Sequence, residues 1–229
     1  MDNATELEPS LLEVPLVEII VRDCERLDYV LTLDSARAHT SSRYRFVCKR
    51  DGNLKLTFIA IGPCAREISI EVILEEEGAQ ATIHGCYALN GTMQHHITLV
   101  QDHQAPHTKS YSMVQCALAG EALFNYHGII NIAQRAHGTD AALYNKNVLL
   151  SHTARAVAMP SLEVHTNSVQ CKHGTATSSF NDDQVVYLKS RGIDEQKAKE
   201  LLIRGFFSDE FNLTQEQFAR ITHELLICQ

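Results

Sequence analysis

The sequence predicts a mainly β protein that ends in a short α-helical part. Three observations predict this class: apolar and polar residues alternate over most of the chain, short turn-forming segments separate the alternating runs, and the pattern changes to a helical period after Phe180. Hydrophobic residues make up 45% and charged residues 21% of the 229 residues, as in an ordinary globular protein. We expect one main body with a small appendage.

The predicted strands lie between Val14 and about Val169. In a half-buried strand every second side chain faces the core, and this period is clear in RYRFVCK, LKLTFIA, EISIEVIL, HITLV, GIINIA and SLEVH. The segments DGN (51–53), IGP (61–63), LNGT (89–92) and HGTD (137–140) favour tight turns between them. Because no fixed repeat length appears, the pattern leaves three folds open: a β-sandwich, a cupin-type barrel and an irregular parallel β-helix.

Three short helices are predicted after Phe180 from their end signals. Asn181 is a candidate N-cap for the first helix, and Gly192 is its stop. Asp194 can cap the second helix, and Thr214 with Gln217 forms a capping box before the third. We therefore expect a polar tail over 1–13, a β core over 14–179 and a helical subdomain over 180–229.

The second helix also predicts which of its residues are buried. One apolar stripe at three-to-four spacing contains Ala198, Leu201, Leu202 and Phe206. We expect this stripe to pack against the rest of the protein. Phe207 is then expected to lie on the outward face.

Composition excludes several classes of protein. The net charge of −8 and the lack of a basic cluster argue against nucleic-acid binding. No apolar run approaches the ~20 residues of a membrane span, and the acidic start MDNATELEPS does not resemble a secretory signal. The seven cysteines are an odd number without paired spacing, so a disulfide framework is not expected. We expect a cytoplasmic protein that binds neither membranes nor nucleic acid.

A group of histidines supports one enzymatic hypothesis. His95, His96, His103 and His107 lie close together in the sequence with Asp102 among them, and imidazole and carboxylate groups are common metal ligands. A small cupin-like metalloenzyme using His95, His103 or His107 is therefore the alternative function. Surface or turn histidines explain the same residues. The nucleotide-binding and hydrolase motifs GxxxxGK, GxGxxG and GxSxG are absent.

The segment VQCKHGTAT contains a thiol and an imidazole two residues apart. In a strand, Cys171 and His173 lean to the same face, whereas Lys172 points away. Together these groups suit a soft metal or an iron–sulfur cluster. A buried thiol beside a hydrogen-bonded histidine is the structural alternative.

Residues 145–206 closely resemble the end of the core domain in the SufB/SufD family of iron–sulfur cluster assembly scaffolds. The matching segments keep the order and spacing of the family: NVLLS (147–151), P-x-LEV (160–164), V-x-C-x-HGT (169–175), an acidic turn (181–183) and YLxSRGI (187–193). Weaker similarity extends the match over residues 15–229. The C-x-HG form is similar to the SufD branch more than to SufB.

The resemblance implies a fold and a non-catalytic role. It implies a right-handed parallel β-helix with a C-terminal helical subdomain. It also implies that the chain pairs with a SufB-like subunit or with a second copy of itself. His173, with Cys171 as its companion, would lie at a cluster-assembly site shared between the two subunits. We therefore expect no cofactor bound stably by the isolated chain, and a transient iron–sulfur cluster in the assembly.

The resemblance also implies an ATPase partner and a shortened architecture. An ABC-type ATPase, SufC, is expected to dock on the C-terminal helices, where we assign Arg191, Phe206 and Phe207 to the docking surface. ATP hydrolysis would then belong to the partner. Typical members are nearly twice as long and begin with a helical domain, which leaves two roles open for this chain: a full scaffold partner, or a reduced version that works as a homodimer.

Overall fold

A computed structural model describes residues 16–33, 41–62, 67–180, 182–207, 211 and 213–226. The predicted tail over 1–13, the Asn181 cap, Pro63 of the IGP segment, and Cys64 and Cys228 lie outside this part of the chain. The described residues form twelve strands followed by three helices. None of the described helices is long and apolar enough to cross a bilayer.

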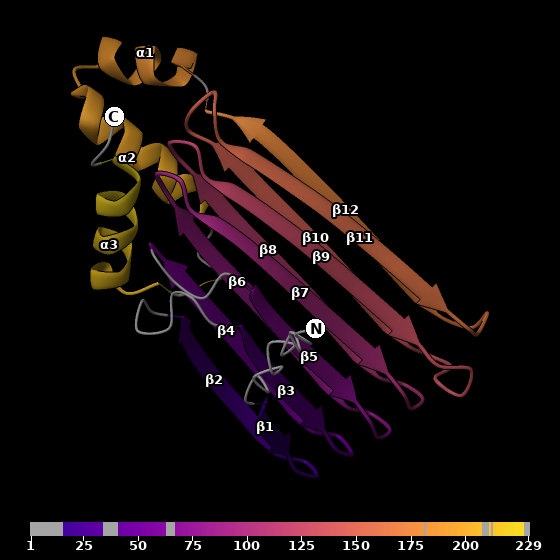
Figure 1. The fold of residues 1–229 in the computed structure, drawn as a ribbon. Coiled ribbons are helices and arrows are strands. Elements are labelled where there is room, and N and C mark those ends of the chain that lie inside the picture. The colour runs from indigo at the N-terminus through magenta and orange to yellow at the C-terminus, as the bar shows by residue number, and fades with distance from the viewer. Residues whose placement is uncertain are drawn as a thin grey trace, which may run out of the picture.

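Two six-stranded sheets, A and B, face each other, and successive strands alternate between them (Figure 1). Sheet A contains β1 (Leu16–Val21), β3 (Ser42–Cys48), β5 (Glu67–Leu74), β7 (Gln94–His103), β9 (Leu123–Ile132) and β11 (Arg155–Val164). Sheet B contains β2 (Arg26–Leu33), β4 (Asn53–Ile61), β6 (Gln80–Leu89), β8 (Lys109–Leu118), β10 (Asp140–Leu149) and β12 (Gln170–Ser179).

Every strand pair is parallel, and each strand inside a sheet lies between the strand one turn earlier and the strand one turn later. The molecule is therefore a parallel β-helix, which confirms the expected fold and excludes the sandwich and the barrel. Paired positions are 26 residues apart from Ser42 to Ile68 and 32 residues apart from Leu123 to Arg155. The turns thus differ in length, which is why no fixed repeat appears in the sequence.

The predicted turns form the corners of the β-helix. At one corner, a residue with positive φ recurs in each successive turn: Cys24, Asp51, Gly78, His107 and Gly138. Its N–H donates to a carbonyl of the next turn, as from Asp51 to Glu77 at 3.0 Å and from His107 to His137 at 2.9 Å. The corners therefore continue the hydrogen-bond ladder between the turns.

The opposite corner stacks glycines on one another. Gly91 and Gly120 both have φ of +63°, a conformation that side chains with a Cβ rarely adopt. A Cβ at Gly120 would lie 2.7 Å from the backbone nitrogen of Gly91. Backbone therefore packs directly on backbone at this corner, which explains the glycines of LNGT and of the next turn.

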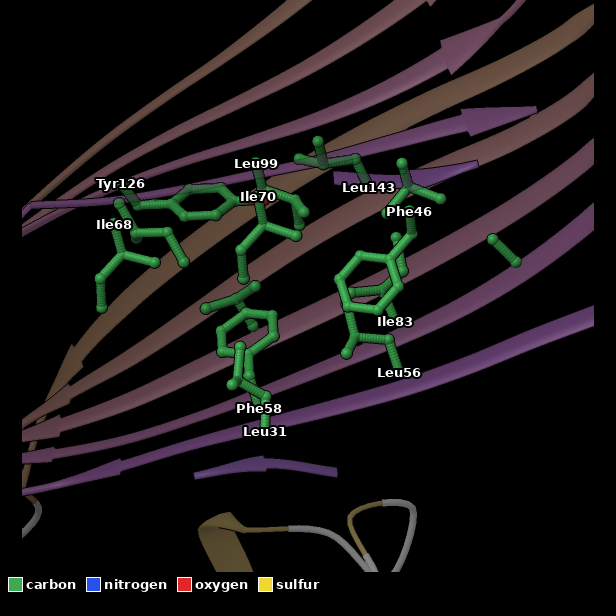
Figure 2. Close-up of a cluster of buried hydrophobic side chains, with 14 of the residues drawn as sticks. Leu31, Phe46, Leu56, Phe58, Ile68, Ile70, Ile83, Leu99, Tyr126 and Leu143 are labelled. Atoms are coloured by element: carbon green, nitrogen blue, oxygen red, sulfur yellow. The ribbon is translucent and has the colours of Figure 1, made fainter. Parts of the chain in front are cut away.

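The core fills the space between the sheets. Figure 2 shows buried side chains from strands of both sheets pointing toward one another, including Phe46 and Ile70 from sheet A and Leu56, Phe58 and Ile83 from sheet B. All five side chains are fully buried. At about 25 cal/mol per Å² of apolar area removed from water, burial of this kind is the main source of stability.

Three helices follow the last strand: α1 (Asp182–Ser190), α2 (Glu195–Phe206) and α3 (Gln215–Leu226). The predicted end signals inside the described residues are confirmed. Gly192 has φ of +87°, and Asp194 accepts a hydrogen bond from the Lys197 N–H at 3.0 Å. Thr214 and Gln217 exchange the two hydrogen bonds of a capping box, at 2.9 and 3.1 Å.

The helices cover one half of the outer face of sheet B, near the carboxyl ends of its strands (Figure 1). Helix residues Ile203, Ile221 and Leu225, with Phe207 and Phe211, form a second apolar cluster with strand residues. The Gln115 amide donates to the Phe206 carbonyl at 2.8 Å, which fixes the end of α2 against β8.

The predicted faces of α2 are wrong for two residues: Phe207 is 4% exposed and lies inside the second cluster, whereas Leu201 is 40% exposed. Ala198 is buried as predicted, and Leu202 and Phe206 are half-buried. The sequence carries two adjacent apolar pairs at i, i+4, Leu202/Phe206 and Ile203/Phe207. The second pair packs against sheet B. The buried stripe is therefore rotated by about one residue from the stripe that periodicity selected.

Candidate functional site

The Cys171-x-His173 pair lies on β12, the last strand of sheet B. Among the described strands β12 pairs only with β10, so its other edge meets no described strand. The neighbouring β11 likewise ends sheet A. Both sheets therefore end in open edges at this end of the β-helix, and an open edge is a template for pairing with another chain.

Register fixes where the side chains of β12 point. Cys171 lies beside Ala141 and His173 beside Leu143, both core residues, so the thiol and the imidazole project toward the interior at its open end. Lys172 is exposed on the opposite face. The alternation predicted from the sequence is confirmed.

Cys171 and His173 differ in environment. Cys171 is half-buried against the main core, whereas His173 is exposed. Burial, followed by the negative charge of Asp140, raises the pKa of the Cys171 thiol, and a backbone hydrogen bond from Lys172 offsets this only in part. The thiol is therefore protonated at neutral pH, and a positive charge close to it is needed to form the thiolate.

Polar side chains also occupy inward-facing positions of β12 beyond Cys171 and His173. Thr177 lies beside Asn147, whose amide donates to Thr177 Oγ1 at 3.2 Å and to Asn145 Oδ1 at 2.7 Å. Sequence reasoning missed the two asparagines, which are buried inside the β-helix. The sequence did contain a signal for them, because Asn145 and Asn147 occupy alternate, core-facing positions in the strand pattern YNKNVLL.

Apolar side chains complete the open end on β11. Met159 is 54% exposed on the outer face of β11, while Leu162 and Val164 are 37% and 39% exposed on its inner face. The corresponding residues one turn earlier, Ile130 and Ile132, are completely buried. Leu162 and Val164 thus occupy core positions that no further described strand of sheet A covers.

Cys171 and His173 supply two side-chain ligands for a metal ion or a cluster. In the part of the chain that the structure describes, no three His, Cys, Asp or Glu side chains lie close enough together to bind a metal. Iron–sulfur clusters take about four protein ligands. Additional ligands would have to come from outside the described residues, and the open edge is the place where another chain can supply them.

The histidines of the metalloenzyme alternative do not converge. His95 is buried against Tyr87, with ring centroids 6.2 Å apart, and His96 is exposed on the opposite face. His103 lies inside the β-helix, and its two nitrogens interact with Thr108 Oγ1 and Ser110 Oγ, each at 2.8 Å.

Burial lowers the pKa of His103 to about 4, so this residue is a neutral core histidine at physiological pH. His107 is a corner residue whose ring packs edge-on against His137. Asp102 accepts a hydrogen bond from Gln104. Each of these residues thus has a structural environment of its own.

The predicted docking residues lie in different environments. Arg191 is exposed, and its guanidinium lies over the Tyr187 ring at 5.3 Å. Phe206 is half-buried against Phe207, and Phe207 is buried. The large exposed apolar residues of α1 and α2 are Val186 at 63%, Tyr187 at 58% and Leu201 at 40%.

Comparison with known proteins agrees with this architecture. The family model "SUF system FeS cluster assembly, SufBD core domain" matches residues 2–206. Iron–sulfur cluster assembly SufBD family proteins of Mycobacterium leprae and Mycobacterium tuberculosis are 31% and 32% identical over 93% of this chain. The iron–sulfur cluster assembly protein SufD of Escherichia coli is 26% identical over 87% of the chain.

These alignments cover 58%, 57% and 55% of the three relatives, so the chain spans a little more than half of their length. The match to the family model contains the twelve strands and the first two helices. Fold and sequence agree, and the chain belongs to the SufBD core family of iron–sulfur cluster assembly proteins.

Proposed function

We propose that this chain is a non-catalytic scaffold subunit on which an iron–sulfur cluster is assembled at a site shared with a second subunit. The family membership supports a role in cluster assembly, with the cluster as cargo and not as a resident cofactor. The observation that carries the proposal is the position of Cys171 and His173. Both project from an open edge strand into the mouth of the β-helix, where one chain supplies too few ligands.

The partner at this site is a SufB-like subunit or a second copy of this chain. Pairing there would satisfy the backbone groups of the β11 and β12 edges and would cover Met159, Leu162 and Val164. It would also place the partner's ligands beside Cys171 and His173. The small, exposed side chain of Ala176 leaves room for close approach of the partner backbone.

A SufC-like ABC ATPase is the proposed partner of the helical subdomain. Since Phe207 is buried, we move the docking surface to the exposed side of α1 and α2, where Val186, Tyr187 and Leu201 lie. Arg191 belongs to this surface through its contact with Tyr187. Phe206 is half-buried and lies at its margin, lining a groove with Leu201.

Two substitutions separate assembly from folding. His173→Ala removes the exposed imidazole, and we expect it to abolish cluster assembly when the gene complements a strain that lacks it. His96→Ala is the matched control, because it removes another exposed imidazole, from β7 of sheet A. We expect this variant to complement normally. A fully active His173→Ala protein, or equal loss with His96→Ala, would contradict the proposed site.

Reconstitution tests the need for a second subunit. The isolated chain should acquire little iron from ferrous iron and sulfide under anaerobic conditions, whereas the chain paired with its partner should acquire a cluster with its visible absorption. Sedimentation of both samples shows whether pairing has occurred. Equal iron and absorption in a purely monomeric sample would rule out a shared site.

The docking surface is tested by comparing two aromatic residues. Tyr187→Ala should weaken the binding of a SufC-like ATPase in a pull-down at unchanged thermal stability, since the side chain is exposed. Phe207→Ala should instead lower the free energy of unfolding by about 3–5 kcal/mol, because its ring is in the second apolar cluster. ATPase binding that survives Tyr187→Ala together with Leu201→Ala would place the docking surface elsewhere.

A further inference from the structure

A second exposed surface lies on the outer face of sheet B, beside the half that the helices cover. Outward-facing side chains at the amino ends of β4, β8, β10 and β12 form this surface. It borders the helical part, because Tyr111 and Tyr144 pack against the second apolar cluster and Lys55 lines a pocket with Gln217 of α3. We call it the lysine face. Its defining residues are Lys55, Lys109, Tyr111, Tyr144 and Lys172.

The lysine face carries more lysines than neighbouring carboxylates, on a chain whose net charge is −8. None of Lys55, Lys109 and Lys172 forms an ion pair with a residue that the structure describes. Two acidic residues adjoin these lysines in register: Asp140 lies beside Lys109, and Asp28 lies beside Lys55. Asp28 is paired with Arg26 at 4.0 Å.

The outer face of sheet A shows the opposite arrangement. Arg45 lies between Glu18 and Glu71, at 3.6 and 2.7 Å, and Lys49 contacts Glu75. Arg45 is thus matched by acidic residues of the two neighbouring strands, and Lys49 by one at the adjacent corner. The three lysines of the lysine face have no such ion pair among the described residues.

Two tyrosines form the apolar centre of the lysine face. Tyr111 and Tyr144 are half-buried, and their ring centroids are 6.0 Å apart. The neighbouring outward residues are small: Ala142 lies beside Tyr111, and Gly174 lies beside Tyr144. A Cβ at Gly174 would lie 3.1 Å from the Tyr144 ring, so the glycine lets this ring lie flat over β12.

The pairing of the strands sets the length of the lysine face. Lys55, Thr82, Tyr111, Ala142 and Lys172 occupy one row across five neighbouring strands. Four interstrand spacings of about 4.8 Å place the two terminal lysines about 19 Å apart, with Tyr111 midway. A helix of about 13 residues spans that distance at 1.5 Å per residue.

We propose that the lysine face binds an amphipathic helix of a partner protein that has an apolar centre and acidic residues at both ends. Helices already cover the other half of the same sheet face, so a further helix beside them completes the usual layer of helices on a sheet. Tyrosine is enriched among the residues that contribute most to interfaces, and acidic ends match Lys55 and Lys172.

The helix-binding surface does not share side chains with the cluster site. Cys171 and His173 project from the inner face of β12, whereas Lys172 and Gly174 lie on the outer face. Loss of helix binding and loss of cluster assembly are therefore separate outcomes. Substitutions on the lysine face are expected to leave the isolated chain folded, because its lysines are exposed or partly exposed.

The test uses two synthetic 14-residue helical peptides with the same Leu/Ala stripe, one with Glu and one with Lys at both ends. Fluorescence anisotropy measures binding at low and at high salt. We expect the Glu peptide to bind at least tenfold more tightly than the Lys peptide, and high salt to weaken its binding. The variant Lys55→Glu/Lys172→Glu should reverse this preference, and Tyr144→Ser should weaken binding of the Glu peptide at least fivefold.

The matched control is Arg43→Glu/Arg155→Glu on the outer face of sheet A, which changes the net charge by the same amount. We expect this control to keep the preference for the Glu peptide. Circular dichroism melts check that each variant is folded. Failure of the Glu peptide to bind, an unchanged preference in Lys55→Glu/Lys172→Glu, or an equal effect of the control would each overturn the proposal.

Discussion

The two ends of the β-helix interior differ in chemistry. Between β3 and β6 the inward side chains are almost all apolar and include Phe46 and Phe58. Between β10 and β12 the inward rows contain Asn145, Asn147 and the Cys171/His173 pair. The same backbone geometry thus encloses an apolar core at one end and polar side chains at the other, open end. The first end supplies stability, and the second contains the residues that we propose for cluster assembly.

The largest expected effect is a substitution in the apolar end. Phe58→Ala removes a ring that packs on Gly85 and on the edge of Tyr87, with ring centroids 6.0 Å apart. We expect a loss of about 3–5 kcal/mol in the free energy of unfolding. Urea denaturation measures it, with Thr175→Ala on exposed β12 as the control, expected to change stability by less than about 0.5 kcal/mol. Comparable losses of stability in Phe58→Ala and Thr175→Ala would show that the two ends do not differ in this respect.

The next largest effect is a loss of stability at low pH. It comes from His103, which lies between the two ends of the β-helix. Burial lowers the pKa of His103 to about 4, below its ordinary value, so the unfolded chain binds a proton more readily than the folded one. Stability from this residue is therefore complete above pH 6.5 and falls as the pH drops toward 4. We expect a loss of up to roughly 3 kcal/mol over that range.

Urea denaturation at a series of pH values measures this loss. The variant His103→Gln keeps hydrogen-bonding capacity without a titrating group, so its stability should depend less on pH over the same range. His96→Gln, at an exposed position, is the control and should keep the dependence of the natural protein. Identical pH profiles for the natural protein and His103→Gln would contradict the assignment.

A smaller effect is expected at the polar end. Asn147→Ala leaves the buried Asn145 Oδ1 without its 2.7 Å hydrogen bond, and an unsatisfied buried polar group costs about 1–3 kcal/mol. Thr177→Val removes only the longer contact of Asn147 and should cost less than Asn147→Ala. Chemical denaturation of both variants checks the order. The reverse order would show that β12, and not the buried asparagine pair, stabilises this end.

The smallest effect on stability is expected at the cluster site itself. His173 is exposed, so His173→Ala should change the free energy of unfolding by no more than about 0.5 kcal/mol. Thermal melts of the purified variant measure this, beside the complementation described above. A melting temperature lowered by many degrees would identify His173 as a packing residue and would make the two ends alike in role.

Much of the architecture is predictable from local patterns. The alternation in LKLTFIA and EISIEVIL identifies β4 and β5, because one face of each strand meets the core. Turn residues such as Asp51 and Gly91 mark the corners, where positive φ is required. Local patterns do not distinguish a β-helix from a sandwich, since that choice depends on which strands pair across a whole turn.

The site was predictable in part, and the helix faces were not. The two-residue spacing of Cys171 and His173 predicts that their side chains lie on one face of a strand. Their position at the open end of the β-helix depends on the order of the strands. In α2, both Leu202/Phe206 and Ile203/Phe207 fit a helical stripe. Only the position of the helix on sheet B decides that Phe207 is buried. Tertiary packing, and not periodicity, thus selects the buried pair.

The ladder of parallel turns has a mechanical consequence. Each strand pairs only with the strands one turn away, so the described β-helix is a series of similar links with no strand that ties distant turns together. Pulled apart from one end, such a series would give way link by link. Each link would release about 30 residues, or about 100 Å of extended chain, and the force trace would be a sawtooth whose spacing varies with the unequal lengths of the turns.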